Sequence, residues 1–226
     1  MTDIPILIPV KEYSARCNKK NYALLPYAAD YIQGLDASNR TTVIADSQGL
    51  TILAASLGLH TYLEKRYSNQ DELRSCYNYA KQNSIQYFFL CPVTQPFKSE
   101  KLMQQMSEVF EKEMEQRDFI TTISKVTDRN LFYVEDFGNG YRFIHDMPNR
   151  KRSQCATQYM IDGVLYLIKT SFLEKVMLSD DPNKTFWSGN FNCVLNEAPF
   201  MDIDTDADMN CFRYLNTYFK IKLIPG

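Results

Sequence analysis

Apolar runs of strand length alternate with longer segments of helical periodicity over the first half of the chain. The run Tyr87 to Cys91 is the most apolar of them and is typical of a central strand covered on both faces. Strands are expected at Ile4 to Pro9, Thr41 to Ala45, Leu59 to Leu63 and Tyr87 to Cys91. Helices are expected from about Tyr22, from Ser47 as a cap to Leu57 before Gly58, from Asn69 to Asn83 and from Ser99 to about Gln116. The alternation predicts an α/β fold with a Rossmann-like, mainly parallel sheet flanked by helices.

After Phe119 the pattern changes to short strands separated by turn residues. Further strands are expected at Ile120 to Val126, Leu131 to Glu135, Tyr141 to His145 and Tyr159 to Lys169. We interpret residues 127–158 as an inserted β element within a single domain of residues 1–226. Thr170 or Ser171 is expected to cap a short helix, and Thr205 to Phe219 to form the closing helix.

Composition and charge exclude several kinds of partner. The chain has 25 basic and 27 acidic residues, so its formal net charge of −2 creates no global attraction to nucleic acid or to an anionic membrane. No apolar run approaches the roughly 20 residues of a membrane span, and the N-terminus lacks the features of a signal peptide. The six cysteines form no CxxC pair, which favours free thiols in a reducing compartment. We therefore expect a cytoplasmic protein that binds neither nucleic acid nor membrane.

The loop between the first strand and the first helix concentrates positive charge. Between Val10 and Asn21 it contains Lys11, Arg16 and Lys20, together with the hydroxyl of Ser14. Such donors, with a helix N-terminus, suit the phosphates of a nucleotide, because the crevice of a parallel sheet lies at the carboxyl ends of its strands. A solvated loop with its lysines in water is the alternative, and the loop contains no glycine to let phosphate approach the backbone closely.

A second cluster of polar residues precedes the closing helix. In an extended segment, Asp202 and Asp204 point to the same side, and two carboxylates suit a Mg²⁺ that takes its other ligands from water and phosphates. The alternative is a helix cap, because Thr205 and Asp208 have the spacing of a capping box. That cap explains Thr205 and Asp208 better than it explains Asp202.

The loop after the central strand is the third candidate. Two prolines fix its course, and Thr94, Gln95 and Lys98 supply polar groups, although a rigid connector would have the same composition. The two histidines, His60 and His145, have no partners at catalytic spacing, and we assign them structural or surface roles. No local arrangement suggests a nucleophilic triad.

Taken together, these motifs resemble those of the cytidylyltransferases that activate 2-keto sugar acids, the acylneuraminate and CMP-Kdo synthetase family. Its opening pattern, I-P-A-R-x-x-S-x-R/G-x-x-x-K-N, is similar to Ile8 to Asn21 without a gap, and its I-D-I-D-T-x-x-D pattern is similar to Met201 to Asp208. Val43 to Asp46 loosely matches V-S-T-D, Cys91 to Lys98 resembles L-Q-P-T-S-P-L-R, and a later R-x-Q and Y-x-x-N-G-A-x-Y pair is similar to segments at Arg152 and Tyr159. The likeness extends over nearly the whole chain.

The resemblance implies roles for residues at matching positions. Those expected at the nucleotide are Pro9, Val10, Lys11, Ser14, Arg16, Lys20, Asn21 and Asp46. Those expected at the sugar are Thr94, Gln95, Gln154, Tyr159 and Asp162, with Pro92 replacing a glutamine of the family. Asp202 and Asp204 would bind Mg²⁺, and Lys11, Arg16, Lys20 and Asp204 would be catalytic.

The activity that this implies is transfer of CMP from CTP to a 2-keto-3-deoxy sugar acid for surface glycans such as lipopolysaccharide or capsule. The resemblance also implies a homodimer in which residues 127–158 form the dimerisation arm. The chain departs from the pattern where Lys11 replaces an arginine and where Glu12 and Tyr13 replace small residues, which removes bidentate phosphate recognition and adds a negative charge. Two alternatives therefore remain: a weakened or inactive nucleotide-binding relative that acts as a partner protein, and a nucleotidyltransferase for another sugar.

Overall fold

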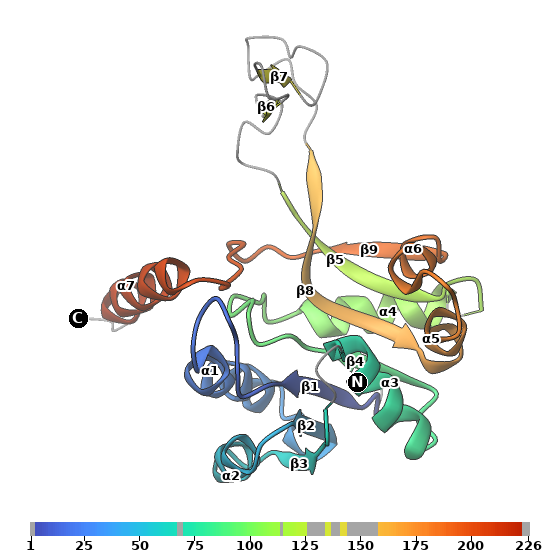
Figure 1. Cartoon of the computed structure of the whole chain (residues 1–226), viewed down its shortest axis with the longest axis horizontal. Helices are drawn as coiled ribbons and strands as arrows, with labels where there is room; N and C mark the ends of the chain where they lie inside the picture. Colours follow the sequence, from blue (N-terminus) through green and yellow to red (C-terminus); the bar gives the residue numbers. More distant parts are fainter. Residues whose placement is uncertain are drawn as a thin grey trace.

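A computed structural model describes residues 3–66, 70–113, 115–125, 134–136, 141–143 and 158–222. Its main feature is a seven-stranded sheet of order β3-β2-β1-β4-β8-β5-β9 (Figure 1). The strands are β1 (Ile6–Val10), β2 (Thr41–Ala45), β3 (His60–Leu63), β4 (Tyr87–Leu90), β5 (Phe119–Lys125), β8 (Tyr159–Lys169) and β9 (Phe191–Leu195). All five residues of β1 are buried, as expected of a strand near the middle of a sheet covered on both faces.

Most neighbouring strands of this sheet are parallel. β1 pairs in parallel with β2 and β4, β2 with β3, and β5 with β9, whereas β8 is antiparallel to both β4 and β5. The predicted α/β fold with a mainly parallel sheet is therefore confirmed. The reversal at β8 has a simple cause: Lys125 at the end of β5 pairs with Tyr159 at the start of β8, so the chain leaves and re-enters the sheet at one place.

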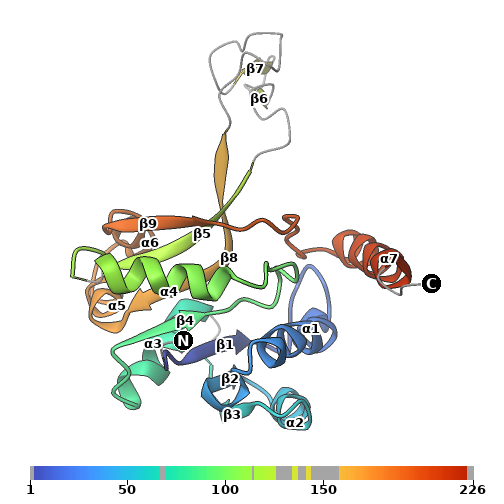
Figure 2. The ribbon, with the colours of Figure 1, turned by 180° about the vertical axis from the view of Figure 1, so that it is seen from behind.

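Helices cover both faces of the sheet, as the two buried clusters show (Figures 1 and 2). On one face lie α1 (Lys20–Gly34), α2 (Gln48–Ser56), α4 (Leu102–Glu113) and α7 (Asp206–Lys222). On the other lie α3 (Glu72–Gln82), α5 (Thr170–Met177) and α6 (Pro182–Trp187). β1 joins the two clusters, because Ile6 and Ile8 face the first and Leu7 faces the second. The short 3₁₀ helix η1 (Ser38–Arg40) precedes β2.

A separate two-stranded antiparallel sheet lies within the predicted insert. It pairs β6 (Val134–Asp136) with β7 (Tyr141–Phe143), and most of the other residues of 127–158 lie outside those that the structure describes. The boundaries of the insert and the single-domain organisation stay predictions.

Several local predictions can be checked directly. Ser47 does cap α2, since its hydroxyl accepts from the backbone N–H of Leu50 at 3.4 Å, and Gly58 follows the end of that helix with a φ of 75°. The predicted cap at Thr170 or Ser171 is wrong. Lys169 is the N-cap of α5, and the Thr170 hydroxyl instead donates to the carbonyl of Ile85 at 2.6 Å, joining α5 to the segment before β4.

The sequence pattern did not predict α6 or β9. α6 is a short helix with Pro182 in its first turn and a cap at Asp181, whose side chain accepts from the backbone of Lys184 at 3.0 Å. A helix of six residues is too short to repeat an apolar pattern, whereas β9 is as long as β1 and was missed because Asn192 interrupts its apolar run. The five cysteines that the structure describes are free thiols. Among the described helices, none has the length and apolar character needed to cross a bilayer.

Candidate functional site

Three loops meet at the carboxyl edge of the sheet. Val10 at the end of β1 pairs with Ala45 at the end of β2, and Leu7 of β1 pairs with Leu90 at the end of β4. The parallel pairing therefore brings together the loops that follow β1, β2 and β4. Asp46 is the first residue of the loop after β2. This is the edge at which open α/β sheets bind their ligands.

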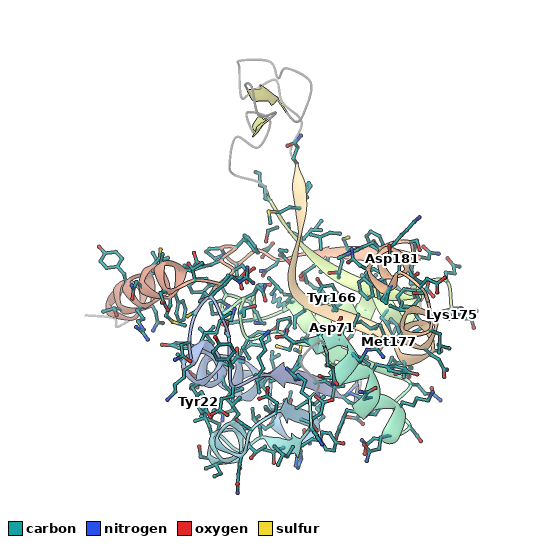
Figure 3. All side chains as sticks on the ribbon, in the orientation of Figure 1. Tyr22, Asp71, Tyr166, Lys175, Met177 and Asp181 are labelled. Atoms are coloured by element: carbon teal, nitrogen blue, oxygen red, sulfur yellow. The ribbon has the colours of Figure 1, made fainter. Side chains whose placement is uncertain are left out.

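Side chains rather than glycines fix the loop after β1. The amide of Asn21 donates to the carbonyl of Lys11 at 2.6 Å, and the backbone N–H of Glu12 donates to Oδ1 of Asp46 at 2.7 Å. The hydroxyl of Tyr22, labelled in Figure 3, donates to Oε1 of Glu12 at 3.0 Å. The predicted nucleotide residues Lys11, Asn21 and Asp46 thus lie together, although Asn21 and Asp46 hold the loop itself.

The N-terminus of α1 lies at the other end of this loop. Lys19 precedes the helix with a φ of 55° and no side-chain capping hydrogen bond, and the first turn contains no acidic residue. Ser14 is buried, with 9% of its surface exposed. The uncapped N–H groups of the first turn give this end of the loop a positive character suited to an anion.

Lys20 and Arg16 both bind Asp204. Nζ of Lys20 lies 2.9 Å from Oδ1, and a terminal nitrogen of Arg16 lies 3.1 Å from Oδ2. Lys20 also donates to the carbonyl of Ile203 at 2.9 Å, and its side chain is only 6% exposed. The structure therefore brings two of the predicted catalytic cations onto the predicted catalytic and metal-binding aspartate.

Asp202 is joined to the loop after β4. Its Oδ1 accepts from the amide of Gln95 at 3.0 Å, and the adjacent backbone N–H of Ile203 donates to the carbonyl of Thr94 at 2.9 Å. The hydroxyl of Thr94 in turn donates to Oε1 of Gln95 at 3.0 Å. Partial burial of the carboxyl group, and then the negative charge of Asp204, raise the pKa of Asp202 above its ordinary value.

The predicted capping box at the start of α7 is present. The hydroxyl of Thr205 accepts from the backbone N–H of Asp208 at 3.2 Å, and Oδ2 of Asp208 accepts from the backbone N–H of Thr205 at 2.8 Å. The same Oδ2 accepts from the N–H of Asp204 at 3.2 Å. The cap accounts for Thr205 and Asp208 and also fixes the backbone at Asp204, while Asp202 and the carboxylate of Asp204 remain directed to other partners.

The two aspartates fit a hard divalent cation in part. After burial, the negative charge of Asp204 is the next cause that raises the pKa of Asp202, and a bound cation relieves repulsion of this kind. Within the described residues no group of three or more histidines, cysteines or acidic residues is suitably placed for a metal ion. Any Mg²⁺ held by Asp202 and Asp204 would therefore need further ligands from water and phosphate oxygens, which is its usual mode with nucleotides.

A cavity of about 490 Å³ adjoins the loops. Thr94 and Gln95, which contact the aspartate segment, line the cavity together with Lys11, and Tyr166, Phe186 and Trp187 give it an aromatic wall. The wall is packed edge to face, with 5.1 Å between the ring centroids of Phe186 and Trp187. Tyr166 on β8 and Asp71, the N-cap of α3, are both labelled in Figure 3, and both line the cavity. An apolar wall with a few polar groups is typical of a small-molecule site.

Arg66 lines this cavity and was missed in the sequence. Its Nε lies 3.4 Å from Oε2 of Glu64, both side chains are less than 10% exposed, and its two terminal nitrogens have no hydrogen-bond partner among the residues described. The amide of Gln70 donates to the other oxygen of Glu64 at 2.6 Å. Its place in the sequence could have identified it as a site residue, because Arg66 follows β3 at the same carboxyl edge of the sheet.

Charges of both signs face the cavity. Burial raises the pKa of Glu72 above its ordinary value, although the positive charges of Lys11 and Arg66 oppose that shift. Gly163 also lines the cavity, with a φ of 67°, and a Cβ there would lie 3.2 Å from the hydroxyl of Tyr166. Glycine is therefore required at this bend, where the backbone passes close to the cavity wall.

The other predicted sugar residues lie elsewhere. Asp162 is 4% exposed, and its carboxylate accepts from the hydroxyls of Thr122 and Ser124 and from the backbone N–H of Val164. Tyr159 precedes Tyr166 along β8, about 23 Å away at roughly 3.3 Å per residue, and is 51% exposed. Neither lines the cavity described above. Gln154 lies outside the described residues.

Lys98 helps to fix the loop after β4. Its ammonium group donates to the carbonyls of Pro92 and Gln95 and lies 5.9 Å from the ring centroid of Tyr31. Burial lowers the pKa of Lys98, and the opposing influences include the charge of Asp162. In this loop Lys98 therefore holds the backbone, whereas Thr94 and Gln95 face the site.

No model of a known protein family matches the sequence, and no curated protein matches it. Solved structures do match the fold. One is a CMP:2-keto-3-deoxy-manno-octonic acid synthetase complexed with CTP, at a TM-score of 0.69 and 12% identity, covering 96% of this chain and 99% of that chain. A cytidylyltransferase from Leptospira borgpetersenii serovar Hardjo-bovis has a TM-score of 0.65 and 15% identity, covering 96% and 88%.

A third match is a 4-diphosphocytidyl-2C-methyl-D-erythritol synthase from Anaerococcus prevotii, with a TM-score of 0.63 and 15% identity, covering 95% of this chain and 100% of that chain. The chain therefore has the fold of the nucleotide-diphospho-sugar transferases. At these identities the likeness concerns the fold, and the chemistry must be argued from the site.

Proposed function

We propose that this protein is a Mg²⁺-dependent cytidylyltransferase that transfers CMP from CTP to a 2-keto-3-deoxy sugar acid and releases pyrophosphate. The observation that carries the proposal is the meeting of Arg16 and Lys20 with Asp204 at the carboxyl edge of the sheet. The neighbouring Asp202 is joined through Gln95 to the cavity of about 490 Å³. Phosphate-binding cations and a carboxylate pair are the groups that nucleotidyl transfer needs in one place. The structure of a CMP-sugar acid synthetase with CTP, which shares the fold, supports the choice of nucleotide.

In this proposal the anomeric hydroxyl oxygen attacks the α-phosphorus of CTP in line, and the bond from that phosphorus to pyrophosphate breaks. The proton of the hydroxyl passes to solvent. Lys11, Arg16 and Lys20 stabilise the charge that develops on the departing pyrophosphate. Ser14 and the N–H groups at the start of α1 contact phosphate oxygens, and Pro9 and Val10 form the floor of the nucleotide site at the end of β1. No protein nucleophile takes part.

Asp202 and Asp204 would hold the Mg²⁺, which supplies charge neutralisation at the phosphates and polarises the attacking hydroxyl. Gln95 would orient Asp202 through its amide, and Thr94 would position Gln95 and face the sugar. The aromatic wall of Tyr166, Phe186 and Trp187 would exclude water from the acceptor and contact its apolar face. Roles at the sugar for Gln154, Tyr159 and Asp162 belong to the same proposal through the family resemblance alone.

The test is direct synthesis. The protein is incubated with CTP, MgCl₂ and a panel of acidic sugars, and products are identified by mass spectrometry. A CMP-sugar and pyrophosphate are expected with a 2-keto-3-deoxy acid, and the Asp202→Asn and Asp204→Asn variants should each lose this product. Asp206→Asn is the matched control, because it removes an exposed acid of the same segment that is not part of the pair. Retained turnover in both single variants would contradict the metal assignment.

One observation favours a second candidate, a weakened or inactive relative that binds nucleotide and acts as a partner protein. Glu12 places a carboxylate in the phosphate loop, and Tyr22 holds it there. Calorimetric titration with CTP and Mg²⁺ separates the candidates: binding without turnover favours the partner protein, and no binding rules out the nucleotide site. A product formed only with another nucleotide or with a sugar phosphate would instead change the substrate and keep the enzyme class.

The proposal includes a homodimer in which residues 127–158 act as the dimerisation arm, and it assigns the product to surface-glycan synthesis. The support for the arm is the pairing of Lys125 with Tyr159, which places both ends of this segment side by side where β5 ends and β8 begins. Light scattering tests it. A monomer with full activity would contradict the arm's assigned role.

A further inference from the structure

Arg16 and Lys20 bind the same carboxylate but differ sharply in their surroundings. The Lys20 side chain is 6% exposed and has a second acceptor in the carbonyl of Ile203, 2.9 Å away. The Arg16 side chain is 69% exposed and lies 3.1 Å from Oδ2 of Asp204. Moving a buried ammonium group away from two acceptors costs free energy, whereas an exposed ion pair contributes little to stability and is easily broken. Arg16 is therefore the partner of Asp204 that can leave.

The ion pairs affect how the aspartates can bind a divalent cation. One oxygen of Asp204 faces Lys20 and the other faces Arg16, so each carboxylate oxygen already has a cationic partner. The charges of Lys20 and Arg16 offset those of Asp202 and Asp204, and the nearby carboxylate of Asp208 is held by the backbone N–H groups of Asp204 and Thr205. A divalent cation that approached Asp204 alone would meet these two positive charges at its carboxylate oxygens.

A triphosphate changes this balance. It brings several negative charges to the loop that contains Arg16, and a guanidinium binds phosphate oxygens through two parallel hydrogen bonds. Arg16 then gains more from a phosphate than from one oxygen of Asp204. Oδ2 of Asp204 is left without its cationic partner at the moment when phosphate oxygens, the other ligands of a divalent cation, arrive.

We infer that Arg16 exchanges partners between Asp204 in the free protein and a phosphate in the nucleotide complex, and that this exchange makes divalent-cation binding depend on the nucleotide. The inference rests on the proposed function, since it takes the site to bind a nucleoside triphosphate and a divalent cation. It adds a binding order that the proposed function does not require. In this order the free protein excludes the metal ion, and the nucleotide admits it.

Mn²⁺ binding, measured by electron paramagnetic resonance, tests the exchange without any need for turnover. In the free protein, Arg16→Met should tighten Mn²⁺ binding roughly fivefold, the upper range for loss of an exposed ion pair. Arg16→Lys, which keeps a cation at this position, should remain within about twofold of the unmodified protein. Lys19→Met is the matched control, because it removes an exposed charge from the same loop and leaves the ion pairs of Asp204 with Arg16 and Lys20 in place.

The same titration is repeated with a CTP analogue that has a methylene bridge between its α- and β-phosphates. The analogue should reverse which of the two proteins, Arg16→Met or unmodified, binds Mn²⁺ more tightly. Arg16→Met should now bind Mn²⁺ more weakly than the unmodified protein, because Arg16 no longer holds the phosphates that complete the ligand set. Adding Asp204→Asn to Arg16→Met should remove the gain seen in the free protein. Since Arg16 is 69% exposed, its replacement is not expected to disturb folding.

The two possible failures are distinguishable. If the analogue binds but Arg16→Met does not tighten Mn²⁺ binding beyond Lys19→Met, the exchange is wrong and the proposed function stands. If neither the analogue nor Mn²⁺ with the analogue binds the unmodified protein, the proposed function fails and the exchange fails with it. Tight Mn²⁺ binding by the unmodified free protein would also overturn the exchange.

Discussion

Asp46 holds the loop between β1 and α1, in which we propose that phosphate binds, because its Oδ1 accepts from the backbone N–H of Glu12 at 2.7 Å. The contact connects the residue after β2 to the loop after β1, two strands that pair in parallel up to Val10 and Ala45. The family resemblance placed Asp46 at the nucleotide, whereas this geometry also gives it a positioning role.

Asp46→Ala should therefore weaken CTP binding about fivefold to tenfold, because a hydrogen bond of roughly 1 kcal/mol no longer fixes the loop. Isothermal calorimetry with CTP and Mg²⁺ provides the measurement. Asp46→Asn retains an oxygen acceptor and should stay close to the unmodified protein. An Asn variant as weak as the Ala variant would mean that the charge of Asp46, and not its hydrogen bond, is what matters.

The parts of the site predicted from sequence are those that adjacent residues form. Lys11 and Asn21 border one loop between a strand and a helix, and Asp202 and Asp204 alternate along one extended segment. Local spacing is sufficient for such groups. The capping box was predictable for the same reason, since Thr205 and Asp208 are three residues apart.

The remaining parts depend on packing between distant elements. Gln95 and Asp202 are 107 positions apart, and only the tertiary fold brings the amide onto the carboxylate. Arg66 faces the cavity because α3, α5 and α6 cover the same face of the sheet, and α6 was itself missed. The direction of β8 was equally inaccessible, because an apolar run does not show which way a buried strand points.

Gln95→Leu should raise the KM for the sugar acceptor about tenfold and leave the Kd for CTP within about threefold. The substitution removes the amide that orients Asp202 and a polar group from the cavity edge, while the phosphate loop is untouched. Steady-state kinetics and CTP calorimetry give the two values. Thr94→Val, which loses only the hydroxyl that contacts Gln95, should show a smaller effect of the same kind. A loss confined to CTP binding would assign Gln95 to the nucleotide instead.

Thr205→Ala should lower the free energy of unfolding by about 1 kcal/mol, the usual cost of losing an N-cap. Its hydroxyl accepts from the N–H of Asp208 in the first turn of α7. Chemical denaturation gives the value, and Thr205→Ser should recover most of it. Thr217→Ala, on the same helix, is the control: its exposed hydroxyl donates to the carbonyl of Arg213 within the helix, and its loss should matter little. Equal effects at the two positions would show that the cap does not stabilise α7.

Glu113 should make stability depend on pH. The hydrogen bond from Arg117 at 2.6 Å, and then those from Asn192, lower the pKa of Glu113 below its ordinary value of 4.5. A lowered pKa contributes stability that is present above about pH 4.5 and is lost as the pH falls through the lower folded-state value. Glu113→Gln should therefore be less stable than the unmodified protein at pH 7 and equal to it in strong acid.

The control for this titration is Glu111→Gln, an exposed position on the same helix. Unfolding by urea at a series of pH values from 7 to 3 would measure both variants. A deficit of Glu113→Gln that stayed constant over this range would show that the charge of Glu113 does not contribute.

The buried pair of Arg66 and Glu64 should be costly to break from one side. Among the residues described, Arg66→Met leaves the carboxylate of Glu64 with the amide of Gln70 and no cation, so the free energy of unfolding should fall by roughly 3 kcal/mol. The double variant Glu64→Gln, Arg66→Met removes both charges and should recover a substantial part of that loss. Denaturation of the unmodified protein, both single variants and the double variant completes the thermodynamic cycle. Additive effects of the two substitutions would show that the charges do not interact, and that Arg66 is held in the cavity wall by packing alone.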